Sequence, residues 1–175
     1  MSPELDDKLV RAFPIIYRDR YTDPKTSNMC FGFEFADGWF NIIWELSEKL
    51  ESIARKQPEP KPYHPIKKEI QPYYHKLKPY VKNKPEFIYK FFWGTLWDLI
   101  ERPEDRRLKV TQAKETYGEL RVYLNDYSDQ IDEWIDEAEE KSVRTCEVCG
   151  ADGWLHGDFW LVTLCDKHWE EYLNR

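Results

Sequence analysis

The chain has 175 residues, 33 of them acidic and 26 basic, and its formal net charge at pH 7 is −7. This length suffices for one domain with a proper core, alone or with a small metal module. An acidic chain is a poor general nucleic-acid binder, since phosphate attraction carries most of that affinity, and no apolar run reaches the roughly 18 residues that span a bilayer. With no signal peptide ahead of the predicted fold, we expect a soluble, cytoplasmic protein without a membrane partner.

The first 55 residues predict a helix, a strand and a second helix. Ser2-Pro3 is typical of a helix start, and Pro14 ends that helix. A short extended segment, 15–17, and a polar loop are expected next. Phenylalanines at positions 31, 33 and 35 alternate as in a strand with one aromatic face. Asp37-Gly38 then turns the chain into a helix that ends before the proline at position 58.

Residues 56–84 differ in kind, because prolines are interleaved there with lysines and tyrosines and no long regular element can form. Residues 55–92 hold ten basic and three acidic residues, a local net charge of +7. Two interpretations stay open: a solvated, proline-stiffened connector, or a surface that holds phosphates and stacks bases. In the second, the nucleic-acid or nucleotide-binding residues would be Lys67, Lys68, Tyr73, Tyr74, Lys76 and Lys78, with Lys61, Tyr80 and Lys82 beside them.

Three further elements are predicted between residues 85 and 142. An apolar helix over 86–100 is either central to the core or partly covered by a second subunit, as in a homodimer. Two alternating runs on either side of Tyr117-Gly118 predict a β-hairpin with a four- or five-residue turn. On one face of this hairpin we expect Leu108, Val110, Gln112, Leu120, Val122 and Leu124.

A helix over 126–142 is predicted to bury a stripe of Ile131, Trp134, Ile135 and Ala138. The same helix carries a dense run of acidic residues on its other sides. A run of this kind is usually a solvated face, and the alternatives are a surface for a basic partner or a mimic of DNA phosphates. The candidate partner-binding residues are Asp132, Glu133, Asp136 and Glu137.

Two pairs of metal-ligand side chains lie near the C-terminus, Cys146-x-x-Cys149 and Cys165-x-x-His168. A two-residue spacer lets one tight turn aim both side chains at the same ion, and zinc takes four such ligands tetrahedrally. Between the pairs the sequence predicts a short hairpin with His156 at its tip, and a last helix begins at Cys165. Knuckle, hairpin and helix in this order indicate a treble-clef zinc finger. Since all four positions are filled by protein, we predict structural Zn²⁺.

No set of residues in the sequence assembles into a catalytic site, so no catalytic residue is predicted. The zinc deaminase pattern needs a His-x-Glu before the CxxC pair, and none is present. With seven glycines in all, the chain has no glycine-rich phosphate cradle. Cys30 is expected to be a small buried apolar residue rather than a reactive thiol.

Several segments together resemble an uncharacterised family of small bacterial and bacteriophage zinc-binding proteins. The similar segments are Phe13-Pro14 with Tyr17-Arg18-Asp19-Arg20, residues 29–34 through Asp37-Gly38-Trp39, the hairpin 113–123, and residues 138–142 leading through 145–150 to 163–166. Residues 56–105 lie outside the resemblance, since members tend to have only a short link there. Members commonly end the metal motif with Cys or His, which His168 fits, and often carry a further cysteine where Phe35 stands.

The resemblance implies a compact zinc-containing cytoplasmic protein that is often borne on phages. Small phage proteins of this kind frequently bind host machinery, including antiviral systems. A host protein is therefore the expected partner, and the protein would then act in the host-cell cytoplasm as an anti-defence factor.

We predict an α+β fold: a helical body with a β-hairpin and a C-terminal treble-clef-like zinc module. Residues 1–55 and 85–142 would form the main body, 56–84 a basic insertion, and 143–175 the zinc module. The predicted function is non-enzymatic: a zinc-stabilised protein that modulates a host protein by binding it. The alternative is nucleic-acid or nucleotide binding through the basic, tyrosine-rich segment 61–84.

Overall fold

The computed structural model describes residues 1–25, 27–59 and 106–174. The chain divides into two compact units, Met1–Gln57 with Arg107–Arg175, and Pro58–Arg106. The predicted basic insertion and the predicted apolar helix over 86–100 lie outside the described residues, and so do the boundaries expected there. Within the described residues the fold is α+β, as predicted: four α-helices, a three-stranded sheet and a separate two-stranded hairpin.

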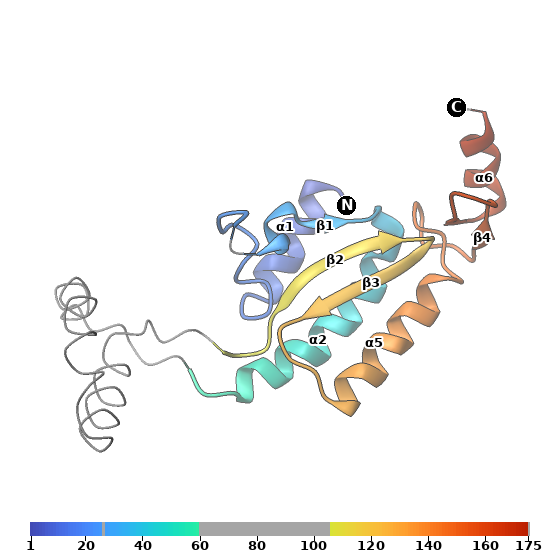
Figure 1. The fold of residues 1–175 in the computed structure, drawn as a ribbon. Helices are drawn as coiled ribbons and strands as arrows, with labels where there is room; N and C mark the ends of the chain where they lie inside the picture. The colour runs from blue at the N-terminus through green and yellow to red at the C-terminus, as the bar shows by residue number, and fades with distance from the viewer. Residues whose placement is uncertain (26, 60–105, 175) are drawn as a thin grey trace, which may run out of the picture. The chain divides into compact units, whose positions relative to one another are not determined.

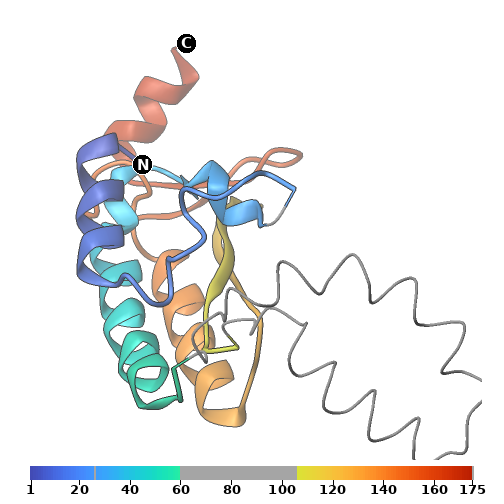
Figure 2. The same cartoon turned by 90° about the vertical axis from the view of Figure 1, so that its left-hand side faces the viewer.

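The first unit is built in two layers, with helices covering one face of the three-stranded sheet (Figures 1 and 2). The sheet has the order β1-β2-β3, where β1 (Phe33–Glu34) runs parallel to β2 (Val110–Thr116) and β2 runs antiparallel to β3 (Glu119–Leu124). The helices α2 (Phe40–Lys56) and α5 (Asp129–Ser142) lie side by side on the sheet. The hydrophobic core fills the space between these layers.

Both long helices form for the reasons the sequence indicates. In α2, Ile43, Leu46 and Leu50 recur at helical spacing and are buried, and the helix stops at Lys56, two residues before a proline. In α5, Ile131, Ile135 and Ala138 make the buried stripe, whereas Trp134, predicted as part of it, is only partly buried against the core. The Ser128 hydroxyl caps α5 by accepting from the Ile131 N–H. The helix therefore begins at Asp129, slightly later than the predicted start at residue 126.

The N-terminal helix α1 (Pro3–Ala12) has the predicted bounds and ends before Pro14. The expected extended segment at 15–17 is wrong, because residues 14–20 form consecutive turns. These turns are held by tertiary contacts that local periodicity does not report. Tyr17 is buried and shares a 2.6 Å hydrogen bond with Ser47 of α2, and Arg20 pairs with Asp6 of α1.

The strand predicted over 29–35 is shorter than expected. Residues Asn28–Phe31 form a 3₁₀-helix, η1, and only Phe33 and Glu34 are in β1. As a result Phe31 is exposed, while Phe33 and Phe35 pack in the core. Gly32 adopts φ +84° between the two elements, a backbone conformation that ends the 3₁₀-helix and breaks the alternation.

The β2–β3 hairpin is confirmed, but its turn has two residues rather than four or five. Thr116 pairs with Glu119, and Tyr117 and Gly118 both have positive φ, as a type I′ turn requires. A register shift between Val110 and Gln112 then moves the inward position to Ala113, so Ala113 is buried and Gln112 is not.

The last part of the chain is a small module on the same unit, made of β4 (Trp154–His156), β5 (Val162–Leu164) and α6 (Asp166–Leu173). A second 3₁₀-helix, η2 (Asp37–Trp39), joins β1 to α2 and lies against this module. In the described part of the chain, no helix has the length and apolar character needed to cross a bilayer.

Candidate metal centre

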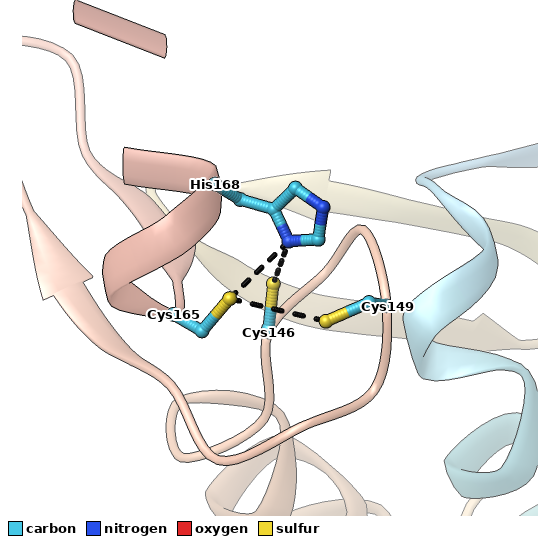
Figure 3. A group of neighbouring side chains, drawn as sticks. All are labelled: Cys146, Cys149, Cys165 and His168. Atoms are coloured by element: carbon cyan, nitrogen blue, oxygen red, sulfur yellow. Dashed lines mark hydrogen bonds between the residues drawn. The ribbon is translucent and has the colours of Figure 1, made fainter. Parts of the chain in front are cut away.

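The four side chains predicted as metal ligands come together in the C-terminal module. Cys146 and Cys149 project from a tight loop, while Cys165 and His168 project from the start of α6, and all four point toward one centre (Figure 3). Their ligand atoms all lie within 4.8 Å of one another. All four cysteines of the chain are free thiols. Among the described residues, no second group of this kind occurs.

Three of the distances between the ligand atoms lie near the edges expected for a tetrahedron around one metal ion. Zinc–sulfur bonds of about 2.3 Å and zinc–nitrogen bonds of about 2.0 Å give edges of roughly 3.5–3.8 Å. The observed edges are 3.9 Å from Cys149 Sγ to Cys165 Sγ, 3.3 Å from Cys146 Sγ to His168 Nδ1, and 3.2 Å from Cys165 Sγ to the same nitrogen. The cluster therefore could hold a metal ion without rearrangement of the backbone.

Local backbone geometry explains why each pair converges. In the first pair, the Gly150 N–H donates to the Cys146 carbonyl at 2.8 Å and Gly150 has φ +77°, which closes the turn around the two sulfurs. In the second pair, Cys165 is the N-cap of α6 and His168 lies three residues later, so both face the same side of the helix start. Each pair thus needs only local structure to present its two ligands.

The pKa values of two of these thiols are shifted in opposite directions. Burial raises the pKa of Cys146, but hydrogen bonds from the backbone around Cys165, Cys149 and Val148, together with His168, lower it to about 7. The pKa of Cys149 is raised: a backbone hydrogen bond from Ala151 lowers it, but burial and the neighbouring Cys146 and Cys165 sulfurs outweigh that bond. One thiolate is thus available near neutral pH, whereas a second thiolate needs a cation beside it.

Metal uptake should therefore depend on pH with a definite sign. Protons compete with the metal for the sulfurs, so acidification weakens binding, and below about 7, the pKa of Cys146, this thiol must also lose a proton to bind the metal. We expect the apparent zinc affinity to fall by up to about tenfold per pH unit for each ligand that must lose a proton. Competition with a chromophoric chelator between pH 8 and pH 6 measures this, and an affinity that does not change over that range would contradict the assignment.

The loop with the first ligand pair is docked on the start of α2 through its backbone. The Gly38 N–H donates to the Glu147 carbonyl at 2.7 Å, and the Ala36 N–H donates to the Glu147 carboxylate at 2.9 Å. Burial raises the pKa of this carboxyl. The fully buried Trp39 donates its indole N–H to the Thr145 carbonyl at 2.8 Å. Three hydrogen bonds therefore join the metal loop to the body.

A second joint connects the module to the tip of the β2–β3 hairpin. The buried Thr163 hydroxyl of β5 donates to the Gly118 carbonyl at 2.6 Å. A Cβ at Gly118 would collide with the Leu155 side chain of β4, so the turn and the strand are in direct contact. The metal module and the hairpin tip thus form a continuous structure.

His156 is not a ligand of the cluster, as the sequence indicates, but its predicted place at the hairpin tip is wrong. It is the last residue of β4 and partly buried, with its Nε2 3.1 Å from the Leu164 carbonyl. Its ring stacks on Trp169 of α6 at a centroid distance of 4.5 Å. The tip consists of the residues after it, where Gly157 has φ +97°.

The four acidic residues predicted to bind a partner lie on α5 but do not share one environment. Asp132 and Asp136 are exposed and line a hollow of about 360 Å³ between α5 and β3. Glu137 is on the side toward α2 and pairs with Lys49 at 2.7 Å, and this ion pair lowers its pKa. Glu133 accepts a hydrogen bond from Gln130. The predicted acidic face is therefore divided between two sides of the helix.

The six residues predicted for nucleic-acid or nucleotide binding, Lys67, Lys68, Tyr73, Tyr74, Lys76 and Lys78, lie outside the described residues. That alternative function stays a prediction. The docking residues Gly38, Trp39 and Glu147 were not predicted as part of the site. The only sequence signal for them is the run Asp37-Gly38-Trp39 ahead of a helix, and it does not say what the glycine and the indole contact.

No family model matches the chain, and neither the curated proteins nor the solved structures contain a match to it. The assignment of the metal centre and of its contacts with the body is therefore based on the residues and distances described above.

Proposed function

We propose that this protein is a non-enzymatic binding protein whose C-terminal module is a treble-clef-like finger stabilised by structural zinc. One observation supports this most directly: the chain itself supplies four convergent ligands, three sulfurs and one nitrogen, whose ligand atoms all lie within 4.8 Å of one another. Soft thiolates with one imidazole favour zinc over hard cations. A site with four protein ligands has no position left for a substrate or a reactive water.

In this proposal the zinc ion links two pieces of chain that otherwise share only a small core and a few hydrogen bonds, among them the Glu147 N–H to the Thr163 carbonyl at 2.9 Å. The module core is small, with Cys146, Val162 and Leu164 buried and Cys165 and Trp169 packed against them. Helix α6 has no buried residue at all. Such a module cannot bury enough apolar surface to order itself, so metal binding would supply its folding free energy.

The proposed partner is a protein with a basic surface. In the phage setting that the resemblance implies, this partner would be a protein of the host, such as a component of an antiviral defence system. The negative charge of the hollow beside α5 supports a partner with a positively charged surface. Asp132 and Asp136 have no Lys or Arg partner among the described residues, whereas Glu139 is paired with Arg121, which also lines the hollow, so the two aspartates give the hollow its negative charge. Opposite charges around such a hollow would steer a basic partner and fix its register.

Reversal of the two unpaired charges tests this proposal. The double variant Asp132→Lys/Asp136→Lys is expected to weaken capture of the partner from host lysate at least about tenfold, mainly through a slower association rate. The matched control is Glu170→Lys/Glu171→Lys, which makes the same change in net charge on exposed positions of α6. Quantitative mass spectrometry of the bound fraction is the readout. If both double variants capture the partner equally, the α5 surface is not the binding surface.

A further inference from the structure

An aromatic groove lies where the tip of the β2–β3 hairpin meets the β4–β5 loop. Its volume is about 260 Å³, and the lining residues are Glu115, Thr116, Tyr117, Phe159, Trp160 and Leu161. Tyr117 and Trp160 are each 72% exposed, and Phe159 is 99% exposed. Single exposed aromatic residues are ordinary, but three from two separate loops around one hollow form a patch that favours binding.

The backbone at Tyr117 indicates that this ring is displayed at a conformational cost. Tyr117 has φ +56°, and it is the only non-glycine residue with positive φ in the described part of the chain. Asn, Asp or Gly usually occupies this position of a two-residue hairpin, because a larger side chain strains the left-handed conformation. Burial of the ring offsets little of this conformational cost, since the side chain is largely exposed. A strained, exposed aromatic residue on a rigid turn is typical of a contact residue.

The charge of the groove indicates the kind of ligand that the groove would bind. Glu115 is its only acidic or basic lining residue, and one carboxylate oxygen accepts the Gly118 N–H at 2.6 Å, which fixes the side chain in place. No Lys or Arg pairs with Glu115 among the described residues. Aromatic rings with one carboxylate attract a cation, since the ring faces are negative and the carboxylate neutralises the charge.

We propose that this aromatic groove binds a lysine or arginine side chain of an extended protein segment, with apolar neighbours of that side chain resting on Phe159 and Trp160. The proposal rests on the protein-binding function proposed above and names a contact on the partner. The basic character required here agrees with the acidic hollow beside α5, although the two sites are lined by different residues.

The groove depends on the metal module for one of its two walls. The Tyr117 wall is the turn between β2 and β3 of the main sheet, whereas the Phe159–Trp160 wall is the loop between β4 and β5. That loop is held by the Thr163–Gly118 hydrogen bond and by the strand that leads into Cys165. A metal ion in the cluster would thus keep the two walls in register.

The test is a selection of random dodecapeptides on the zinc-loaded full chain, with counter-selection on the Trp160→Ala variant. We expect enriched peptides to contain a Lys or Arg beside aromatic or aliphatic residues. Recovery of no sequence above background, or of sequences without a basic residue, would overturn the proposal. So would a concentration-dependent dimer of the full chain that Trp160→Ala abolishes, because the groove would then hold a second copy.

Binding of the best selected peptide, measured by fluorescence anisotropy, separates the roles of ring and charge. Glu115→Gln keeps the acceptor for the Gly118 N–H but removes the charge, and should weaken binding at least fivefold and reduce its salt dependence. Tyr117→Asn should weaken binding while raising the melting temperature, because asparagine tolerates the left-handed conformation. Phe31→Ala, at an aromatic residue 63% exposed outside the groove, is the control and should bind normally. Equal binding by all three variants would contradict the proposal.

Failure of this proposal can be distinguished from failure of the proposed function. If metal removal leaves the fold and partner capture intact, the zinc-stabilised binding function is wrong, whatever the peptides show. If metal removal abolishes capture but selection yields no basic peptides, only the assignment of the aromatic groove is wrong.

Discussion

Replacing Cys165 by serine is expected to release the metal and unfold the C-terminal module while the main body stays folded. Cys165 is a ligand at the N-cap of α6, so its replacement removes one sulfur from the cluster, while serine still suits the N-cap position. In small finger peptides, structural zinc contributes roughly 10–16 kcal/mol of apparent binding free energy at neutral pH, and these peptides are unfolded without it. The module has only a small core of its own, so the loss of one ligand should be large enough to unfold it.

Hydrogen–deuterium exchange measures this effect locally. In the variant, amides of residues 143–174 should lose protection, whereas those of α2 and β2 should keep it. Cys30→Ser is the matched control, since Cys30 is the one cysteine outside the cluster. It should retain one equivalent of zinc and normal protection. A Cys165→Ser protein with full zinc content and an unchanged exchange pattern would show that the ligands are assigned wrongly.

Gly38→Ala is expected to destabilise the protein, because the added methyl group would meet the backbone of the metal loop. A Cβ at this position would lie 2.5 Å from the Gly150 nitrogen and the Glu147 oxygen, and nearer still to the Cys146 carbonyl oxygen. All three atoms belong to the backbone of the metal loop, so no side-chain rotation can relieve the clash. Overpacking of this kind costs typically ~1–3 kcal/mol, which for a chain of this size lowers the melting temperature by roughly 2–12 °C.

The glycine is required here for close approach and not for its φ angle, since it is not among the residues with positive φ. Asn41→Ala, an exposed substitution in the first turn of α2, is the matched control and should change stability by less than about 0.5 kcal/mol. Calorimetry and zinc content should be measured together. We expect Gly38→Ala to bind zinc but to melt at a lower temperature. A melting temperature equal to that of the control would contradict docking of the metal loop on α2.

The features that the sequence predicts well are the ones set by local chemistry. The spacing of Cys146, Cys149, Cys165 and His168 contains the whole ligand set, because each pair converges within a single turn of chain. The helical stripes of α2 and α5 are likewise visible as a period. Here local structure and tertiary packing require the same residues, so periodicity alone identifies them.

The predictions fail where a long-range contact or a single backbone angle determines the local structure. Alternation at Phe31, Phe33 and Phe35 suggested a strand, but the positive φ of Gly32 leaves only Phe33 and Glu34 paired with β2. The aromatic groove was missed for a similar reason. Tyr117 and Trp160 are 43 residues apart, and their loops are brought together by the Thr163–Gly118 hydrogen bond and by the contact of Gly118 with Leu155. Neither residue belongs to a recognisable motif.

The acidic residues of α5 illustrate what composition leaves open. The sequence shows how many acidic residues this helix carries. It does not indicate that Glu137 is paired with Lys49 of α2 or that Glu139 is paired with Arg121 of β3. These two ion pairs neutralise part of the negative charge of α5 within the fold. Asp132 and Asp136 remain without such partners among the described residues, which narrows the proposed protein-binding surface to one side of the helix.

The most direct test of the zinc-stabilised module is X-ray absorption at the zinc edge on the purified full chain, with metal content measured on the same sample. The account predicts one zinc per chain, bound by three sulfurs at about 2.3 Å and one nitrogen at about 2.0 Å. A chain purified without stoichiometric zinc, or with zinc bound mainly by oxygen, would contradict it.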